Sequence, residues 1–108
     1  MTEESLDEKF TRLHTYGTEN IEYYTDRFNF NKLLDLYANW RRALDGPIST
    51  PRPEGMPGKE HYKWDRWNSL TDKSVDDCKR DYVALIESMN VELIRLGVME
   101  ATEESDPL

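Results

Sequence analysis

Two side chains that can bind phosphate stand one helical turn apart in the middle of the chain. Tyr37 and Arg41 have i, i+4 spacing, so on a helix a phenol and a guanidinium would project side by side. Trp40 adds a flat aromatic surface on which a base or another ring could stack. The same residues also fit a plainer arrangement, in which Tyr37 and Trp40 belong to the core and Arg41 is a solvated charge at its rim.

A second basic and aromatic cluster is the hexapeptide Lys-Trp-Asp-Arg-Trp-Asn at residues 63–68. On a helix Trp64 and Trp67 share one face, so both rings could enter a core while Lys63 and Arg66 stay at its rim. Residues 41–66 contain six basic and four acidic side chains, although the whole chain has a net charge of −8. A positive island in an acidic protein favours a compact anionic ligand over a long polyanion, with ordinary surface charge as the alternative.

The residues that usually perform catalysis or bind metals do not form a recognisable motif. The chain has no nucleophile paired with a base at a suggestive spacing, and no glycine-rich phosphate loop. Cys78 lies on an apolar stripe and is interpreted as a core residue, and a single cysteine excludes an intramolecular disulfide. His14 and His61 are isolated and are interpreted as surface or structural histidines. We therefore expect no enzyme activity, no metal site and no cofactor.

Length and charge narrow the class of protein further. A chain of 108 residues fits one domain, and its negative charge argues against nucleic-acid binding. No stretch approaches the ~18 apolar residues of a membrane span, and the first residues are acidic where a secretory signal would be basic and then apolar. The sequence predicts a cytoplasmic protein without a membrane span.

Apolar residues at spacings of three and four predict an all-α fold with four helices. The first helix covers the stripe from Phe10 to Phe28, in which Gly17 is a small position where another helix could approach. The other three are a helix capped by Asn29 or Asn31 and stopped by Gly46-Pro47, a short helix beginning near Lys59, and a long helix between a Ser74 cap and Gly97. Four of the five prolines lie between the second and third helices, where we expect a loop.

The chain resembles the acyl-CoA-binding protein family. The match runs without a gap from about Leu33 to Met89, and its most specific part is the Lys-Trp-Asp-x-Trp-Asn string at 63–68 followed by Tyr82. The resemblance implies a four-helix, up-down-down-up bundle over residues 1–98, with the core match at 33–89. Residues 99–108 are expected to form an acidic, disordered tail.

Members of this family bind long-chain fatty acyl-CoA without transforming it. The resemblance therefore implies a monomeric carrier and pool buffer that supplies enzymes using acyl-CoA. It places the 3′-phosphate near Tyr37, Arg41, Lys63 and Tyr82, with Arg41 replacing a lysine, and adenine on Trp40. The remaining ligand contacts that it implies are Ala38, Asn39 and Lys59, with the acyl chain along Leu33, Leu34 and Tyr62. Tyr62 stands where the family usually has a small residue, so we expect it to shorten or cover the acyl groove.

The N-terminal part of the chain departs from the family pattern. The ungapped register puts His14 at a usual phenylalanine and Glu22 at a position that is often basic and ligand-facing. Residues 57–60, Pro-Gly-Lys-Glu, also change the order of a family motif that contains a lysine. These departures leave an alternative: a helical protein-interaction module on the same scaffold, with weak or lost acyl-CoA binding.

Overall fold

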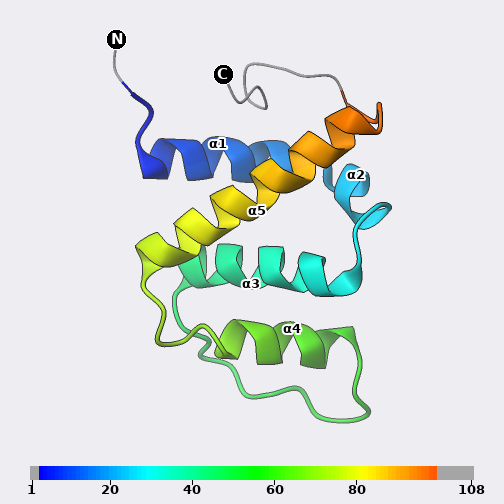
Figure 1. The fold of residues 1–108 in the computed structure, drawn as a ribbon. Coiled ribbons are helices and arrows are strands. Elements are labelled where there is room, and N and C mark those ends of the chain that lie inside the picture. The colour runs from blue at the N-terminus through cyan, green and yellow to red at the C-terminus, as the bar shows by residue number, and fades with distance from the viewer. Residues whose placement is uncertain (1–2, 100–108) are drawn as a thin grey trace.

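A computed structural model describes residues 3–99, which form five helices and no strand. The helices are α1 (Leu6–Glu19), α2 (Ile21–Thr25), α3 (Phe30–Asp45), α4 (Lys59–Asn68) and α5 (Val75–Arg95). Figure 1 shows α1 and α5 running in one direction and α3 and α4 in the other. Helix α5 packs against both α1 and α3, and α4 packs against α3. The predicted all-α, up-down-down-up arrangement is confirmed.

The first predicted helix is wrong in one respect, because the structure divides it into α1 and α2. The division lies at Asn20, whose backbone (φ −121°, ψ 31°) leaves the helical region. The Asn20 backbone N–H donates to the carbonyl of Tyr16 at 3.1 Å, and the Asn20 side chain donates to the same carbonyl at 2.9 Å. The apolar stripe passes through this break, so periodicity alone cannot reveal it. Helix α1 begins with a capping box between Ser5 and Glu8, which the Ser-x-x-Glu spacing could have revealed.

The ends of α3 and α5 follow the predicted capping residues. The Asn29 side chain accepts a hydrogen bond from the Lys32 N–H at 2.9 Å, so Asn29 and not Asn31 caps α3. The Ser74 hydroxyl accepts from the Asp77 N–H at 3.0 Å at the start of α5. Gly97 ends α5 in the left-handed region (φ 76°), where glycine has no steric penalty.

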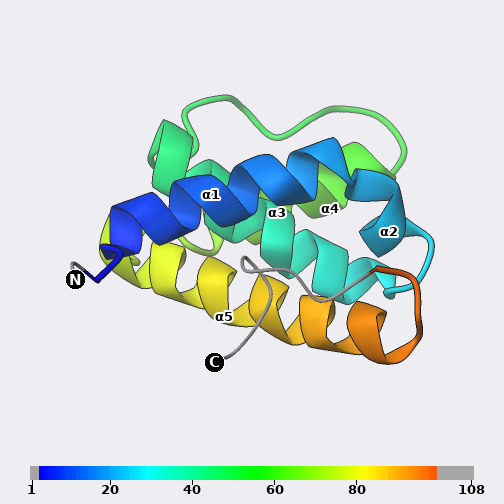
Figure 2. The same cartoon turned by 90° about the horizontal axis from the view of Figure 1, so that it is seen from above.

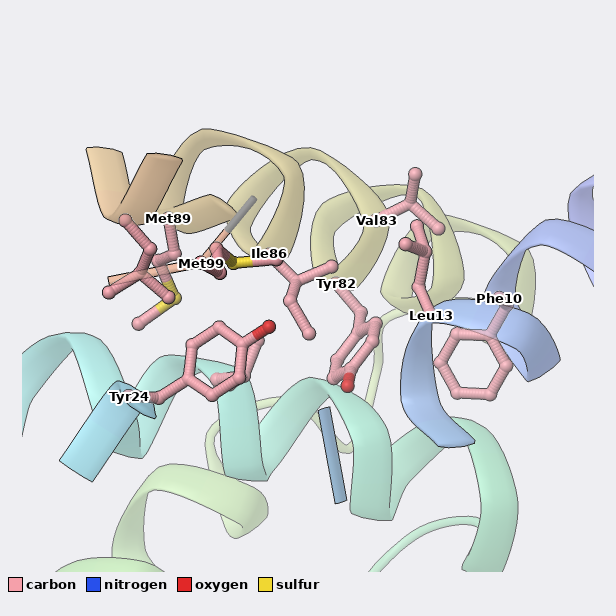
Figure 3. Packing of buried hydrophobic residues seen from close by; sticks show 10 residues of the cluster. Phe10, Leu13, Tyr24, Tyr82, Val83, Ile86, Met89 and Met99 are labelled. Carbon is pink, nitrogen blue, oxygen red and sulfur yellow. The ribbon is translucent and has the colours of Figure 1, made fainter. Parts of the chain in front are cut away.

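The core lies where α5 meets α1, α2 and α3 (Figure 3). A Cβ at Gly17 would lie 2.8 Å from Ile86 Cδ1, so this glycine provides the predicted close approach. The buried Tyr24 hydroxyl donates to Asn90 Oδ1 at 2.5 Å. Met99, expected to be the first residue of the tail, is instead buried in the core cluster. The rest of the expected tail, residues 100–108, lies outside the described residues.

The two tryptophans of α4 do not enter the core as predicted. Both are half-buried, and each indole N–H donates to a backbone carbonyl of the loop between α3 and α4. Trp64 donates to Thr50 at 2.8 Å and Trp67 donates to Gly46 at 2.9 Å. In Figure 2 this loop runs along the side of the molecule opposite α5. Trp64 and Trp67 therefore hold the proline-rich loop against α4.

An ion pair adds to the contact between α3 and α4. Arg66 was expected to be a solvated rim charge, but it is half-buried and forms a salt bridge with Asp35 of α3.

Within residues 3–99 no helix is both long and apolar enough to cross a membrane.

Candidate functional site

A groove of about 510 Å³ opens between α2, α3 and α4. Helix α3 supplies most of its wall, because residues spaced three and four apart lie on one helical face. The lining residues are Ile21 and Thr25 of α2, Phe28 of the following turn, Phe30, Leu33, Leu34, Leu36, Tyr37 and Trp40 of α3, and Lys59 and Lys63 of α4. The groove therefore combines a long apolar wall with two lysines on its opposite side.

Positive charge gathers around the ring of Tyr37. The Lys63 ammonium lies 5.2 Å from the ring centroid, and the Arg41 guanidinium carbon lies 5.9 Å from it. Both distances fall in the range of cation–π contacts, so the ring of Tyr37 holds cations from two helices near each other. Within residues 3–99, Lys59 and Lys63 have no carboxylate partner within 4.0 Å. This end of the groove can stabilise an anion by charge-assisted hydrogen bonds.

Arg41 lies beside the groove and does not line it. Its guanidinium packs on the Trp67 ring at 4.8 Å and pairs with Asp45 at 2.7 Å. Its Nε is buried and has no hydrogen-bond partner among residues 3–99. An anion that binds Arg41 must therefore compete with Asp45, which lies one turn further along α3.

Trp40 provides an aromatic surface of the groove, and its ring packs against His14 of α1. The Trp40 ring lies 5.4 Å from Tyr37, nearly perpendicular to it, and 5.0 Å from the ring of His14. His14 also contacts Phe10 and Tyr82, and burial lowers the pKa of its imidazole. Sequence reasoning missed this role of His14, although its i, i+4 spacing from Phe10 places it on the core side of α1.

Five of the predicted site residues lie apart from the groove. Tyr82 is buried among the core residues with 2% exposure, and burial raises the pKa of its phenol, so its burial argues against a direct ligand contact. Ala38 and Asn39 are also buried, and Asn39 accepts a hydrogen bond from Lys73 at 3.1 Å. Tyr62 is half-exposed and lines a different hollow, and Arg41 is engaged as described above. The groove brings together the other six, Leu33, Leu34, Tyr37, Trp40, Lys59 and Lys63.

Several groove residues have no counterpart among the predicted site residues. Ile21 and Phe28 were assigned to the core stripe of the first helix, and the break at Asn20 was not anticipated. Phe30 directly precedes the apolar stripe of α3, and that position is the signal that could have identified it. Glu22, which was expected to face the ligand, is exposed and lies outside the groove lining.

Candidate metal ligands do not gather in one place in the described part of the chain. Within residues 3–99 no group of three or more His, Cys, Asp or Glu side chains could hold a metal ion. The groove therefore offers apolar contacts, aromatic surfaces and cations as its means of binding.

Comparison with known proteins gives a family match over most of this chain. The family described as Acyl CoA binding protein matches residues 7–86, which include α1 through most of α5. The Acyl-CoA-binding protein of Brassica napus is 32% identical over 71 residues, which cover 66% of this chain and 77% of that protein. The corresponding protein of Saccharomyces cerevisiae is 34% identical over 59 residues, covering 55% and 68%.

A solved structure gives the same result for the fold. The crystal structure of Oryza sativa Acyl-CoA-Binding Protein 2 superposes with a TM-score of 0.68 and is 26% identical in sequence. The superposition covers 90% of this chain and 100% of the rice chain. On the family match over most of its length, and on the helical fold that it shares with a solved relative, this chain belongs to the acyl-CoA-binding protein family.

Proposed function

We propose that this protein binds long-chain fatty acyl-CoA esters non-covalently and serves as an intracellular acyl-CoA carrier and pool buffer. Its family membership and the names of its relatives support acyl-CoA as the ligand. The observation that carries the proposal is the polarity of the groove: an apolar wall leads to Tyr37, beside which Lys63 and Arg41 lie. A ligand with a long apolar chain and an anionic head matches both parts.

The anionic head is assigned to the end of the groove at Tyr37. A 3′-phosphate there would receive charge-assisted hydrogen bonds from Lys63 and a hydrogen bond from the Tyr37 hydroxyl, with Lys59 one turn away on α4. Arg41 contributes positive charge and becomes a direct donor when it leaves Asp45. Trp40 provides the surface on which adenine stacks, a contact that contributes roughly 1–3 kcal/mol per base in other systems.

The acyl chain is assigned to the apolar wall. Leu33, Leu34 and Phe30 form this wall on α3, and Ile21 faces them from α2. Burial of a methylene contributes about 0.8 kcal/mol, so ten methylenes give about 8 kcal/mol before ordering costs. Long chains should therefore bind far more tightly than short ones.

Residues behind the groove act by packing in this proposal. Tyr82, Ala38 and Asn39 are buried, so they support the binding face of α3 from within. Glu22 motivated the alternative of a protein-interaction module that has lost acyl-CoA binding. Its position outside the groove lining removes the expected repulsion from the phosphate and favours the carrier function.

Calorimetric titration with palmitoyl-CoA tests the proposal. We expect binding at a submicromolar dissociation constant, which corresponds to more than about 8 kcal/mol of binding free energy. Palmitoyl-CoA that lacks the 3′-phosphate is the matched ligand, and it should bind at least tenfold more weakly. Absence of submicromolar palmitoyl-CoA binding would contradict the proposed function. Equal binding of the two ligands would contradict the roles given to Tyr37, Arg41 and Lys63.

The carrier role has its own test, because a carrier returns its ligand unchanged. The proposal describes a cytoplasmic monomer that releases intact acyl-CoA to enzymes that use it. Native mass spectrometry should find one chain with one acyl-CoA, and chromatography after long incubation should recover the thioester intact. Free fatty acid released in proportion to protein would instead indicate an enzyme.

A further inference from the structure

A second hollow of about 470 Å³ lies between α3 and α4, on a different face of α4 from the groove. Lys59 and Lys63, four residues apart on α4, line the groove. The second hollow is lined by Tyr62, Asp65 and Arg66 of α4, by Ser69 directly after this helix, and by Phe30, Asn31 and Leu34 of α3. The contact between α3 and α4 therefore separates two hollows of similar size.

The wall between the two hollows is thin and aromatic. Phe30 and Leu34 line both hollows, so each has one side toward the groove and another toward the second hollow. The rings of Phe30 and Tyr62 meet edge to face, with centroids 5.9 Å apart and an interplanar angle of 77°. This pair joins the N-terminal halves of α3 and α4, and Tyr62 contacts Phe30 from the side of the second hollow.

The second hollow is a less favourable place for an acyl chain than the groove. Its lining includes Asp65 and Arg66, which form salt bridges with Arg52 and Asp35. A methyl end beside these charges gains apolar contact only from Phe30, Leu34 and Tyr62. A chain that passes the wall must also displace the contact between Phe30 and Tyr62, which are 40% and 49% exposed and therefore not fixed by the core.

We propose, on the basis of the function proposed above, that Phe30 and Tyr62 form a wall that limits the length of acyl chain the groove accepts, with Tyr62 as the length-determining residue. The wall closes the groove toward the second hollow. Carbons beyond it remain in water and add no affinity. Removal of the Tyr62 ring leaves Phe30 without its partner on α4 and joins the two hollows.

A chain-length series tests this proposal. The full chain is titrated with octanoyl-, dodecanoyl-, hexadecanoyl- and eicosanoyl-CoA. In the wild type, affinity should rise by up to about fourfold per buried methylene and then level off when the groove is filled. In Tyr62→Ala the rise should continue to longer chains, so that the gain from hexadecanoyl- to eicosanoyl-CoA is at least fourfold larger than in the wild type.

Two further variants make the test specific. Tyr62→Phe retains the ring and removes only the hydroxyl, so its series should coincide with that of the wild type. Phe30→Ala removes the other half of the wall and should extend the series in the same direction as Tyr62→Ala. Circular dichroism verifies that each variant is folded.

The outcomes separate the two proposals. A wild type that binds the esters, together with a Tyr62→Ala series that levels off at the same length, overturns the wall and leaves the carrier function intact. A wild-type series that does not level off also overturns the wall. A wild type that binds none of the esters overturns the proposed function and, with it, the inference.

Discussion

The two sides of this small bundle are built differently. Toward α1 and α2, helix α5 presents fully buried side chains, and the polar pair Tyr24 and Asn90 is closed within the core. Toward α4, helix α3 presents half-exposed aromatic residues to an open groove, and α4 contributes Lys59 and Lys63 from the other side. Buried apolar area stabilises the first side, whereas ion pairs and hydrogen bonds to a loop hold the second.

This difference indicates that stability and binding are carried by separate residues. Changes among the α5 core residues should lower the free energy of unfolding with little effect on the affinity of folded molecules. Changes around Tyr37 should alter affinity and leave unfolding nearly unchanged. Each of the following experiments tests that separation, beginning with the largest expected effect.

Leu93→Ala should produce the largest change, and it should be a change in stability. Leu93 is fully buried on α5, and removal of a buried leucine side chain costs about 2–5 kcal/mol in unfolding free energy. Urea unfolding measures this loss, and Val91→Ala, at a half-exposed position of the same helix, is the matched control. At a temperature where both variants are folded, palmitoyl-CoA affinity should match the wild type. A large loss of palmitoyl-CoA affinity in folded Leu93→Ala would contradict the separation of stability from binding.

Lys63→Met should produce the largest change in affinity. The ammonium beside Tyr37 is assigned to the ligand phosphate, and a hydrogen bond to a charged group contributes about 1.5–3 kcal/mol. We expect palmitoyl-CoA to bind about tenfold to a hundredfold more weakly by calorimetry, with urea unfolding unchanged. Lys9→Met removes the same charge from α1, where Lys9 pairs with Glu87, and should leave affinity unchanged. Equal effects of the two substitutions would indicate a general charge effect.

Asp45→Asn should change affinity in the opposite direction. The substitution removes the ion-pair partner of Arg41, whose side chain is 38% exposed, and exposed pairs contribute about 0.2–1 kcal/mol. Release of Arg41 should tighten palmitoyl-CoA binding by up to about fivefold. The control Glu3→Gln removes a negative charge from the exposed segment before α1. Tighter binding should disappear with palmitoyl-CoA that lacks the 3′-phosphate, and its persistence there would contradict the role of Arg41.

His14 should give the smallest effect, a dependence of stability on pH. Burial lowers the pKa of folded His14 below its ordinary value of about 6.5, so the unfolded chain takes up a proton at higher pH than the folded chain. Stability from this group is therefore complete above about pH 6.5 and is lost as the pH falls toward the lower, folded pKa. Urea unfolding at about pH 7.5 and about pH 5.5 should show a smaller decrease in His14→Phe than in the wild type. An identical decrease would show that His14 does not contribute.

The sequence was sufficient where local signals determine structure. Asn29 and Ser74 are cap residues whose side chains satisfy backbone N–H groups within three residues, and the periodicity of α3 and α5 continues to their ends. It was insufficient at Asn20, because the change of backbone conformation at this one residue leaves the apolar period intact. The two tryptophans of α4 were assigned to the core because their spacing shows a shared face. Spacing does not show whether that face meets a helix or a loop.

The site was predicted best where neighbouring residues on one helix decide it. Tyr37 and Trp40, three residues apart on α3, both line the groove, and Lys63, which only the resemblance related to them, lines it from α4. The surroundings of Tyr82 depend on how closely α5 approaches α1 at Gly17, where the Tyr82 hydroxyl would lie 3.3 Å from an added Cβ. That depth of burial is a tertiary property, so the resemblance could transfer the residue but not its exposure.

The positions of the three tryptophans allow ligand binding to be followed by intrinsic tryptophan fluorescence. Trp64 and Trp67 are tied to the loop carbonyls, and of the three only Trp40 lines the groove. A ligand that stacks on Trp40 changes the surroundings of this indole directly, whereas it reaches Trp67 only through Arg41, which packs on the Trp67 ring. Intrinsic fluorescence can therefore follow the filling of the groove in the unlabelled chain, and Trp40→Phe identifies the part of the signal that reports it.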